Sequence, residues 1–134
     1  MRRQLTAEQK QKRDERRRNF REMWGKVAKM PAEERLQLTA NLGVVTCEGR
    51  SLSPANMCLV AMQQPQATVV GGFRQWLRHG RAVKKGEHGL MIWCPTMPNH
   101  SDTPQTEEEA ASERRFIIGT VFDISQTQEV EHAA

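Results

Sequence analysis

The chain has 134 residues, of which 37% are hydrophobic and 27% charged. That length suffices for one domain with a modest core. No apolar run approaches the ~20 residues of a membrane span, so we expect one globular domain and no membrane partner. The net charge is +4, and the charged residues are unevenly distributed along the chain. Residues 1–50 contain thirteen Lys/Arg and seven Asp/Glu, residues 51–95 contain five and one, and residues 96–134 contain two and eight. Clustered basic residues are typical of a protein that binds a polyanion, and an unevenly charged solvated surface is the alternative.

Residues 1–30 are interpreted as a basic helical arm, with a helix over 6–29. Thr6 and Gln9 have the spacing of a capping box. Residues 8–19 contain no large apolar residue and predict either solvated helix or disorder. An apolar stripe at helical spacing follows and is expected to dock on the core: Phe20, Met23, Trp24, Val27 and Met30. The mixed charges of "KQKRDERRRNFR" suit non-specific phosphate contacts, protein docking or a solvated face.

Two further helices are expected before residue 64. The first covers 31–42 and begins at a proline. Its inward residues are expected to be Leu36, Ala40 and Leu42. The second covers about 54–63, where Ser53 and Pro54 have N-cap and first-turn chemistry. Because "ANMCLVAM" is apolar all round, this helix is predicted to be central and buried.

The remaining elements alternate between turns and short periodic runs. Residues 71–80 predict a short helix with a core face of Phe73, Trp76 and Leu77. Residues 81–95 predict a hairpin that turns at Gly86 and Gly89. Residues 96–113 read as a mobile acidic loop, 116–124 as a strand, and 128–134 as a disordered tail. Helices first and strands last indicate an α+β fold, with the N-terminal helices packed on a small antiparallel β-sheet beside a basic helix–hairpin.

The three cysteines, Cys47, Cys58 and Cys94, match neither a disulfide framework nor a CxxC metal site. Cys58 and Cys94 lie in apolar runs and are interpreted as small buried hydrophobes. A reducing cytosol fits free thiols best, and the N-terminus lacks the apolar segment of a signal peptide. We therefore expect a cytoplasmic protein.

A basic cluster lies at the junction of the predicted short helix and hairpin. Its five cations can follow several phosphates of a nucleic acid: Arg74, Arg78, Arg81, Lys84 and Lys85. If the even-numbered residues of the second strand face the core, Trp93 is exposed beside the cations and can stack on a base. If both faces of the strand are covered, Trp93 belongs to the core. His88 is either a phosphate or base contact or an exposed turn histidine.

Catalytic motifs are absent from the sequence. There is no HExxH, P-loop, GxGxxG or GxSxG, and the four histidines are scattered. The carboxylates lie in the predicted acidic loop and at a strand end, without the pocket that a catalytic pair needs. We therefore expect no enzymatic activity, no metal site and no cofactor.

Four motifs in order along residues 49–127 carry a family resemblance. They are Gly49-Arg50 followed by Asn56, "GGFRQW" with Gln75, "GRAVKKGEHG" over 80–89, and "VFDISQ" ending at Gln126. Together they resemble the N-terminal domain of ArdC-type antirestriction proteins, which is also found in TraC-type conjugative primases. The chain departs from the family pattern at Leu52 (usually aromatic), at Ser53-Pro54 (usually Ser-Gly) and at Asp123 (usually Asn).

The resemblance implies a domain over 31–127 that binds single-stranded DNA without strong sequence preference, in phage or mobile-element biology. Lys84, Lys85 and Gly86 match the family's basic turn, and Gln75 matches its helix glutamine. Full-length ArdC proteins add a metalloprotease-like domain with HExxH, which we expect to be absent here. With the basic cluster, the resemblance predicts these DNA-binding residues: Arg74, Gln75, Arg78, Arg81, Lys84, Lys85, His88 and Trp93.

A rival hypothesis uses the same fold as a scaffold. It is a phage or plasmid module that inhibits a host protein through the helical arm and the acidic loop. Salt separates the two hypotheses, because phosphate contacts weaken steeply as salt rises, whereas an apolar protein interface responds much less.

Overall fold

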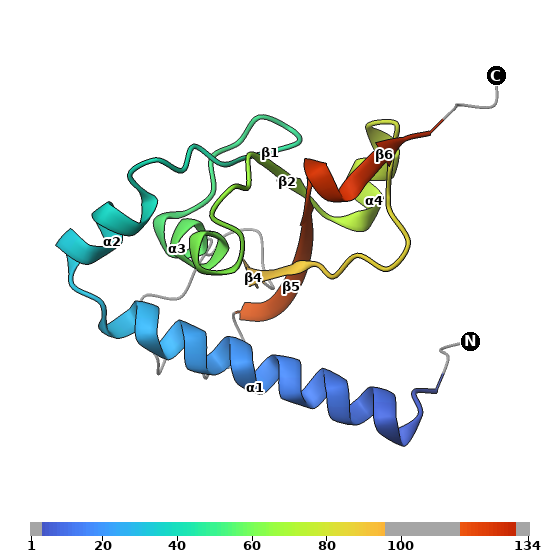
Figure 1. The fold of residues 1–134 in the computed structure, drawn as a ribbon, viewed down its shortest axis with the longest axis horizontal. Coiled ribbons are helices and arrows are strands. Elements are labelled where there is room, and N and C mark those ends of the chain that lie inside the picture. The colour runs from blue at the N-terminus through green and yellow to red at the C-terminus, as the bar shows by residue number, and fades with distance from the viewer. Residues whose placement is uncertain (1–3, 96–115, 131–134) are drawn as a thin grey trace.

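The computed structural model describes residues 4–95 and 116–130 and has an α+β architecture (Figure 1). In chain order the elements are α1 (Ala7–Lys29), α2 (Ala32–Thr39), β1 (Val45–Thr46), α3 (Pro54–Gln63), β2 (Val69–Gly71), α4 (Phe73–Arg78), β3 (Arg81–Val83), β4 (Leu90–Pro95), β5 (Phe116–Asp123), the 3-10 helix η1 (Ile124–Gln126) and β6 (Thr127–Glu129). The predicted fold class is confirmed. The predicted acidic loop, and residues 131–134 of the predicted tail, lie outside the described residues.

Helix α1 carries the predicted capping box and is continuous through its polar half. The Gln9 amide N–H donates to Thr6 Oγ1 at 3.1 Å, and Gln9 Oε1 accepts from the Thr6 N–H at 2.9 Å. Only the C-terminal half buries side chains, namely Phe20, Trp24 and Val27, as the apolar stripe predicts. The N-terminal half therefore extends past α3, below the connection between β3 and β4 (Figure 1).

The sheet is mixed rather than antiparallel. Its order is β1-β2-β5-β4, and β1 pairs with β2 in parallel while the other pairs are antiparallel. Parallel strands need a crossover connection, usually a helix, and α3 lies between β1 and β2 in the chain. The predicted antiparallel sheet is thus wrong at one edge, because no strand was predicted between the helices expected over 31–42 and 54–63, where the two-residue β1 lies.

The predicted hairpin over 81–95 is also wrong. Strand β3 pairs with β6, with Arg81 opposite Glu129 and Val83 opposite Thr127. Strand β4 pairs instead with β5 along six residues, from Leu90 opposite Val121 onward. Residues 128 and 129, predicted at the start of a disordered tail, therefore belong to strand β6. Strand alternation identifies a strand but not its partner, which depends on contacts distant in sequence.

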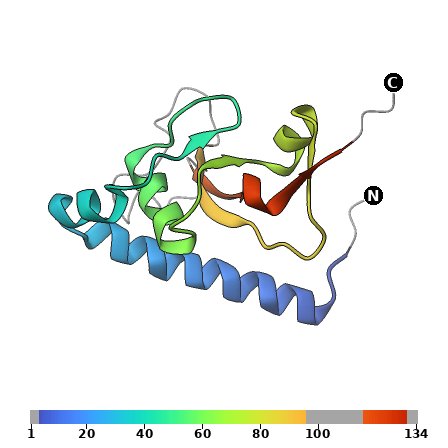
Figure 2. The same cartoon turned by 45° about the horizontal axis from the view of Figure 1, so that its top comes forward.

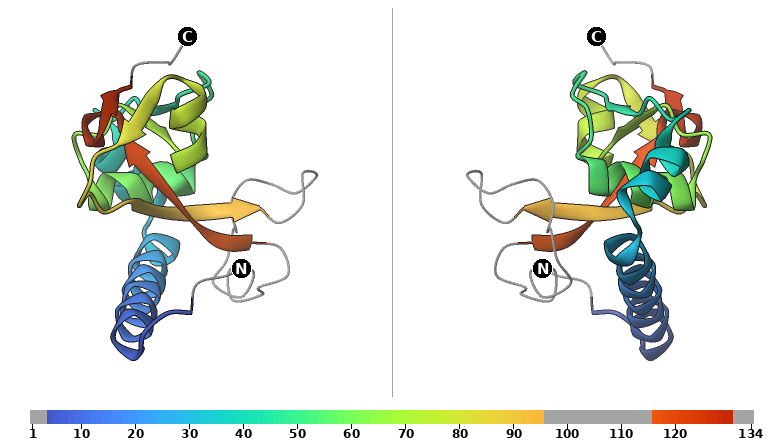
Figure 3. Two further views of the ribbon diagram at one scale, coloured as in Figure 1. Left: turned by 90° about the vertical axis from the view of Figure 1, so that its right-hand side faces the viewer. Right: turned by 90° about the vertical axis from the view of Figure 1, so that its left-hand side faces the viewer.

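Two clusters of buried side chains form the core, and α3 contributes to both, as its apolar sequence predicts. One lies where α1, α3 and the β4–β5 ladder meet: Phe20, Trp24, Val27, Ala55, Cys58, Leu59, Trp93 and Phe116. The other lies on the far side of the sheet: Val44, Val60, Ala67, Val70, Leu90, Ile92 and Val121. Figure 3 shows β4 and β5 crossing over α1. Successive side chains of β4 thus enter opposite clusters.

Two short helices bury fewer side chains than their periodicity predicts. In α2, Leu36 is 71% exposed and Ala40 beyond its end is also exposed, whereas Leu42 packs against the second cluster. In α4, Phe73 is 54% and Leu77 42% exposed. A helix of fewer than two turns brings little of its surface against a neighbour, and α4 buries only Trp76.

Amide side chains of α3 complete the outer edge of the sheet. Asn56 Nδ2 donates to the Trp93 carbonyl, and the Trp93 N–H donates to Asn56 Oδ1, both at 2.9 Å. Two turns further on, Gln63 Nε2 donates to the Met91 carbonyl at 2.7 Å, and the Met91 N–H donates to Gln63 Oε1 at 2.8 Å. The two amides take the place of a neighbouring strand, so that the edge of β4 is paired and covered.

Candidate nucleic-acid interface

Five of the predicted DNA-binding residues are exposed on a continuous segment that runs from α4 through β3 to the following turn. We call this set the basic strip: Arg74, Arg78, Lys84, Lys85 and His88. Gly80, with φ of 78°, ends α4 so that the chain enters β3 directly. Arg78 lies 3.9 Å from Glu48, with both side chains largely exposed. An exposed ion pair of this kind contributes little to the stability of the fold, so the Arg78 guanidinium can exchange Glu48 for a phosphate.

The other three predicted residues serve the fold. Arg81 donates to Thr127 Oγ1 at 2.7 Å and lies 3.8 Å from Glu129, which joins β3 to β6. Gln75 Oε1 accepts from the Gly72 N–H at 2.9 Å and caps α4. Trp93 is 3% exposed, so of the two alternatives that the sequence left open, the one that places it in the core is confirmed. Both faces of β4 are covered, and a base cannot reach this indole.

Trp93 is enclosed by two aromatic rings from α1. Its ring centroid lies 5.0 Å from that of Phe20 and 6.2 Å from that of Trp24, both in edge-to-face geometry. Edge-to-face pairs contribute about 0.5–1.5 kcal/mol beyond area burial. The periodicity of β4 alone did not show that α1 covers this face.

The turn that carries Lys84 and Lys85 is held in place by η1. The Lys84 N–H donates to the Gln126 carbonyl at 2.9 Å, and Gln126 Nε2 donates to the His88 carbonyl at 2.7 Å. Gly86 has φ of 88°, a conformation that glycine adopts without strain. The backbone that presents the lysines is therefore positioned before any ligand arrives, which limits the entropy lost on binding.

Asp123 anchors the segment before η1. Its side chain is buried and accepts from the Thr68 N–H at 2.9 Å and the Ser125 N–H at 3.0 Å. Burial acts to raise its pKa, but hydrogen bonds from Ser125, Thr68 and Val69 outweigh it and hold the pKa below the usual value. A carboxylate at this position, where the family usually has Asn, is therefore accommodated as a charged hydrogen-bond acceptor.

Phe73 is a candidate contact that the sequence interpretation assigned to the core. It is 54% exposed at the start of α4, next in the chain to Arg74. An exposed aromatic beside cations can stack on a nucleic-acid base. The sequence signal was the shortness of the helix, since six residues cannot bury three large side chains against one sheet.

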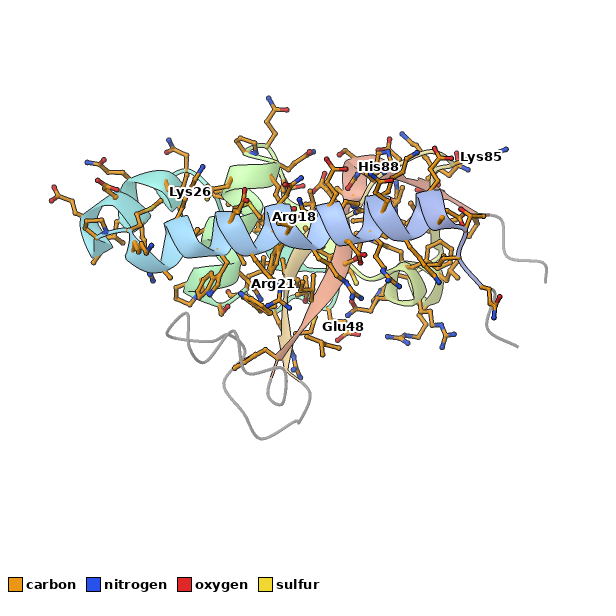
Figure 4. All side chains as sticks on the ribbon, turned by 90° about the horizontal axis from the view of Figure 1, so that it is seen from below. Arg18, Arg21, Lys26, Glu48, Lys85 and His88 are labelled. Atoms are coloured by element: carbon orange, nitrogen blue, oxygen red, sulfur yellow. The ribbon has the colours of Figure 1, made fainter. Side chains whose placement is uncertain are left out.

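Two hollows lined by α1 are also rich in basic residues. One, of about 400 Å³, lies between the N-terminal half of α1 and the sheet and is lined by Lys12, Arg13, Arg16 and Arg17 among others. The other lies on a different face of the helix and includes Arg18 and Lys26. Figure 4, seen from below, shows Arg18 and Lys26 on α1, whereas Lys85 and His88 belong to the connection between β3 and β4 that lies above the helix in Figure 1.

The described ranges, 4–95 and 116–130, contain no group of three or more His, Cys, Asp or Glu side chains that could hold a metal ion. Within the same ranges, no helix has the length and apolar character needed to cross a bilayer.

Comparison with known proteins gives a consistent result. Residues 27–122 match the model of a family described as the N-terminal domain of anti-restriction factor ArdC. The fold resembles the Mn(II)-bound crystal structure of the antirestriction ArdC protein from the R388 plasmid, with a TM-score of 0.53 and 15% identity over 86% of this chain and 41% of that chain. The metal-free structure of that protein gives 0.47 and 16%, over 82% and 43%. No curated protein matches the sequence.

The match to the R388 protein covers only part of that protein, at low sequence identity. At 15% identity the likeness is one of fold, and the chain spans about two fifths of the length of the R388 protein. The described residues offer no ligand set for manganese. The matched residues begin at 27, which leaves most of α1 before them.

Proposed function

Because this chain belongs to the family of the N-terminal domain of anti-restriction factor ArdC, we propose that it binds single-stranded DNA without strong sequence preference and acts in antirestriction or DNA handling for a plasmid or phage. The observation that carries the proposal is the basic strip: four exposed cations and one exposed histidine on one continuous segment, two of the cations on a clamped turn. Its place of action would be the cytoplasm.

Binding would rest on phosphate contacts with one stacked base. Arg74, Arg78, Lys84 and Lys85 would neutralise phosphates and release counterions, a term that ignores sequence. Phe73 would stack on a base, which is worth about 1–3 kcal/mol per base. Only a single strand offers free base faces, because a duplex keeps its bases stacked inside. Phe73 replaces the buried Trp93 as the stacking side chain.

The test is fluorescence anisotropy with labelled oligo-dT and a duplex of equal length, across a salt series. Lys84→Ala/Lys85→Ala is compared with Arg18→Ala/Lys26→Ala, which removes the same charge from exposed positions on α1 outside the strip. Each lost phosphate contact lowers the slope of log affinity against log salt by about 0.7, so we expect a loss of about 1.4 for the strip variant.

Stacking has its own pair of variants. We expect Phe73→Ala to weaken oligo-dT binding about 5- to 150-fold, and Phe73→Leu, which keeps the apolar volume, to weaken it nearly as much. Equal affinity of the strip variant and its control would refute the assignment of the strip. Absence of oligo-dT binding by folded wild type would refute the proposed function and favour the host-protein rival.

A further inference from the structure

The groove between the N-terminal half of α1 and the sheet has no role in the proposal above. One wall is helical and the floor is formed by β4 and β5. Its lining residues are Leu5, Gln9, Lys12, Arg13, Arg16, Arg17, Met91, Ile118 and Thr120. Its volume is about 400 Å³, within the range of about 300–1,000 Å³ for ligand sites.

The helical wall is strongly positive. Lys12 and Arg16, and likewise Arg13 and Arg17, are four residues apart and therefore one turn apart on the same side of the helix. All four are exposed, and no described lining residue is acidic. Low-dielectric walls of one charge sign concentrate the field in a cleft and favour a polyanion.

Existing ion pairs leave these cations available. Lys12 lies 3.7 Å from Glu8, and Arg13 lies 3.3 Å from Asp14, with all four side chains well exposed. Such surface pairs are worth about 0–1 kcal/mol and can be exchanged for phosphate. Arg16 and Arg17 make no ion pair within the described part of the chain.

The floor is apolar and lacks an aromatic ring. Met91 and Ile118 are partly buried side chains that pack against the first core cluster, and Thr120 is exposed. Cations along one wall and an apolar floor can bind a polymer that has phosphates on one side and flat apolar rings on the other. A nucleic acid single strand has this chemistry, and because the described lining residues include no aromatic ring, binding in the groove would rest on the phosphates rather than on base stacking.

The groove and the turn of the basic strip lie toward the same end of the molecule. The connection between β3 and β4 passes above the N-terminal half of α1 in Figures 1 and 2, and the two ribbons are clearly separated in Figure 1. A strand that contacts both the turn and the groove therefore has to span the space between them. Lys12, Arg13, Arg16 and Arg17 all precede residue 27, where the family match begins.

We propose that this groove is a second binding segment for the same DNA strand, with one wall formed by the part of α1 that precedes the family match. The inference rests on the proposed function, because it extends the path of a strand already bound at the basic strip. It makes a distinct statement about length: a short oligonucleotide occupies the strip alone, and a longer one gains affinity from the groove.

The experiment measures anisotropy with oligo-dT of about 6 and about 16 nucleotides, a range set by known single-strand site sizes. The groove variant is Arg16→Ala/Arg17→Ala, and the matched control is again Arg18→Ala/Lys26→Ala. Alanine preserves the helix, and circular dichroism verifies it. We expect the groove variant to bind the long oligonucleotide about tenfold more weakly, with the salt slope reduced by about 1.4, and the short one unchanged.

A second variant tests the floor without removing any cation. Thr120→Glu places a carboxylate in the groove and is expected to lower affinity for the long oligonucleotide only. Equal affinity of wild type and both groove variants for the long oligonucleotide would overturn the inference while leaving the proposed function intact. If neither length binds wild type, the proposed function fails first.

A labelled oligo-glutamate peptide tests the competing occupant. Peptide binding that Arg16→Ala/Arg17→Ala abolishes, together with unchanged oligo-dT binding, would assign the groove to an acidic protein segment and overturn the inference.

Discussion

Replacing Asn56 with alanine tests whether side-chain amides hold β4 in place. The substitution leaves the N–H and the carbonyl of Trp93 without their hydrogen bonds at 2.9 Å, in a site where Asn56 is 4% exposed. Each buried unsatisfied group costs about 1–3 kcal/mol, so the expected loss is about 2–4 kcal/mol once partial relaxation is allowed. For a domain of this size that corresponds to a fall in Tm of roughly 8–16 °C.

The matched comparison is Gln63→Ala. Gln63 makes the same two-bond contact with Met91, but its side chain is only partly buried. Water can replace its bonds, so we expect less than half the loss seen for Asn56→Ala. Urea unfolding followed by tryptophan fluorescence measures both, since Trp24 and Trp93 lie in the affected cluster.

The outcome bears on function because β4 forms part of the groove floor. If Asn56→Ala costs no more than Gln63→Ala, burial of the amide pairing does not matter and the reasoning is refuted. If it costs the expected amount, the asparagine that contributed to the family resemblance is a determinant of the fold rather than a DNA contact.

Three further outcomes are expected. The pKa of Asp123 is held below its usual value, so its ionised side chain stabilises the fold above the unfolded-state pKa of about 3.9. This stabilisation is lost as the pH falls through the folded-state pKa. In urea unfolding, the stability of Asp123→Asn should therefore decrease less than that of wild type between pH 5 and 2. Gly89→Ala would place a Cβ 3.1 Å from the Val121 carbonyl oxygen and closer still to a side-chain methyl group, and is expected to lower stability in urea by about 1–3 kcal/mol. Trp76→Phe removes the 2.9 Å bond from the indole N–H to the Phe122 carbonyl and should cost about 1–3 kcal/mol; an unchanged Tm would contradict it.

Residues whose conformation depends on near neighbours were predicted well. The capping box of Thr6 and Gln9 and the Ser53 cap of α3 both form as the sequence indicates. Helical periodicity also identified the buried face of α1, because several turns repeat the pattern. In α4 the same periodicity predicted burial of Phe73. A helix of six residues repeats the pattern too few times to show which of its side chains are buried.

The predicted site residues also fall into two groups, those whose position depends on local sequence and those whose position depends on distant partners. Exposure of the Lys84-Lys85 turn followed from its local charge and its glycine, whereas Arg81, Gln75 and Trp93 were placed in the fold by partners that the local pattern did not identify. The groove on α1 was not foreseeable, since it needs Met91 from β4 and Ile118 from β5 on the same side as the helix.

By itself, the sequence determined the helices, their caps, the α+β class and the family, because each depends on local chemistry or on ordered motifs. Only the tertiary structure decided that β3 pairs with β6, that α1 covers Trp93, and that the cations of α1 face the sheet across a groove. The physical reason is that the pattern of apolar and charged residues along a strand or helix shows which of its faces is apolar and which is charged. Which other element packs against each face depends on contacts between residues that are distant in the sequence.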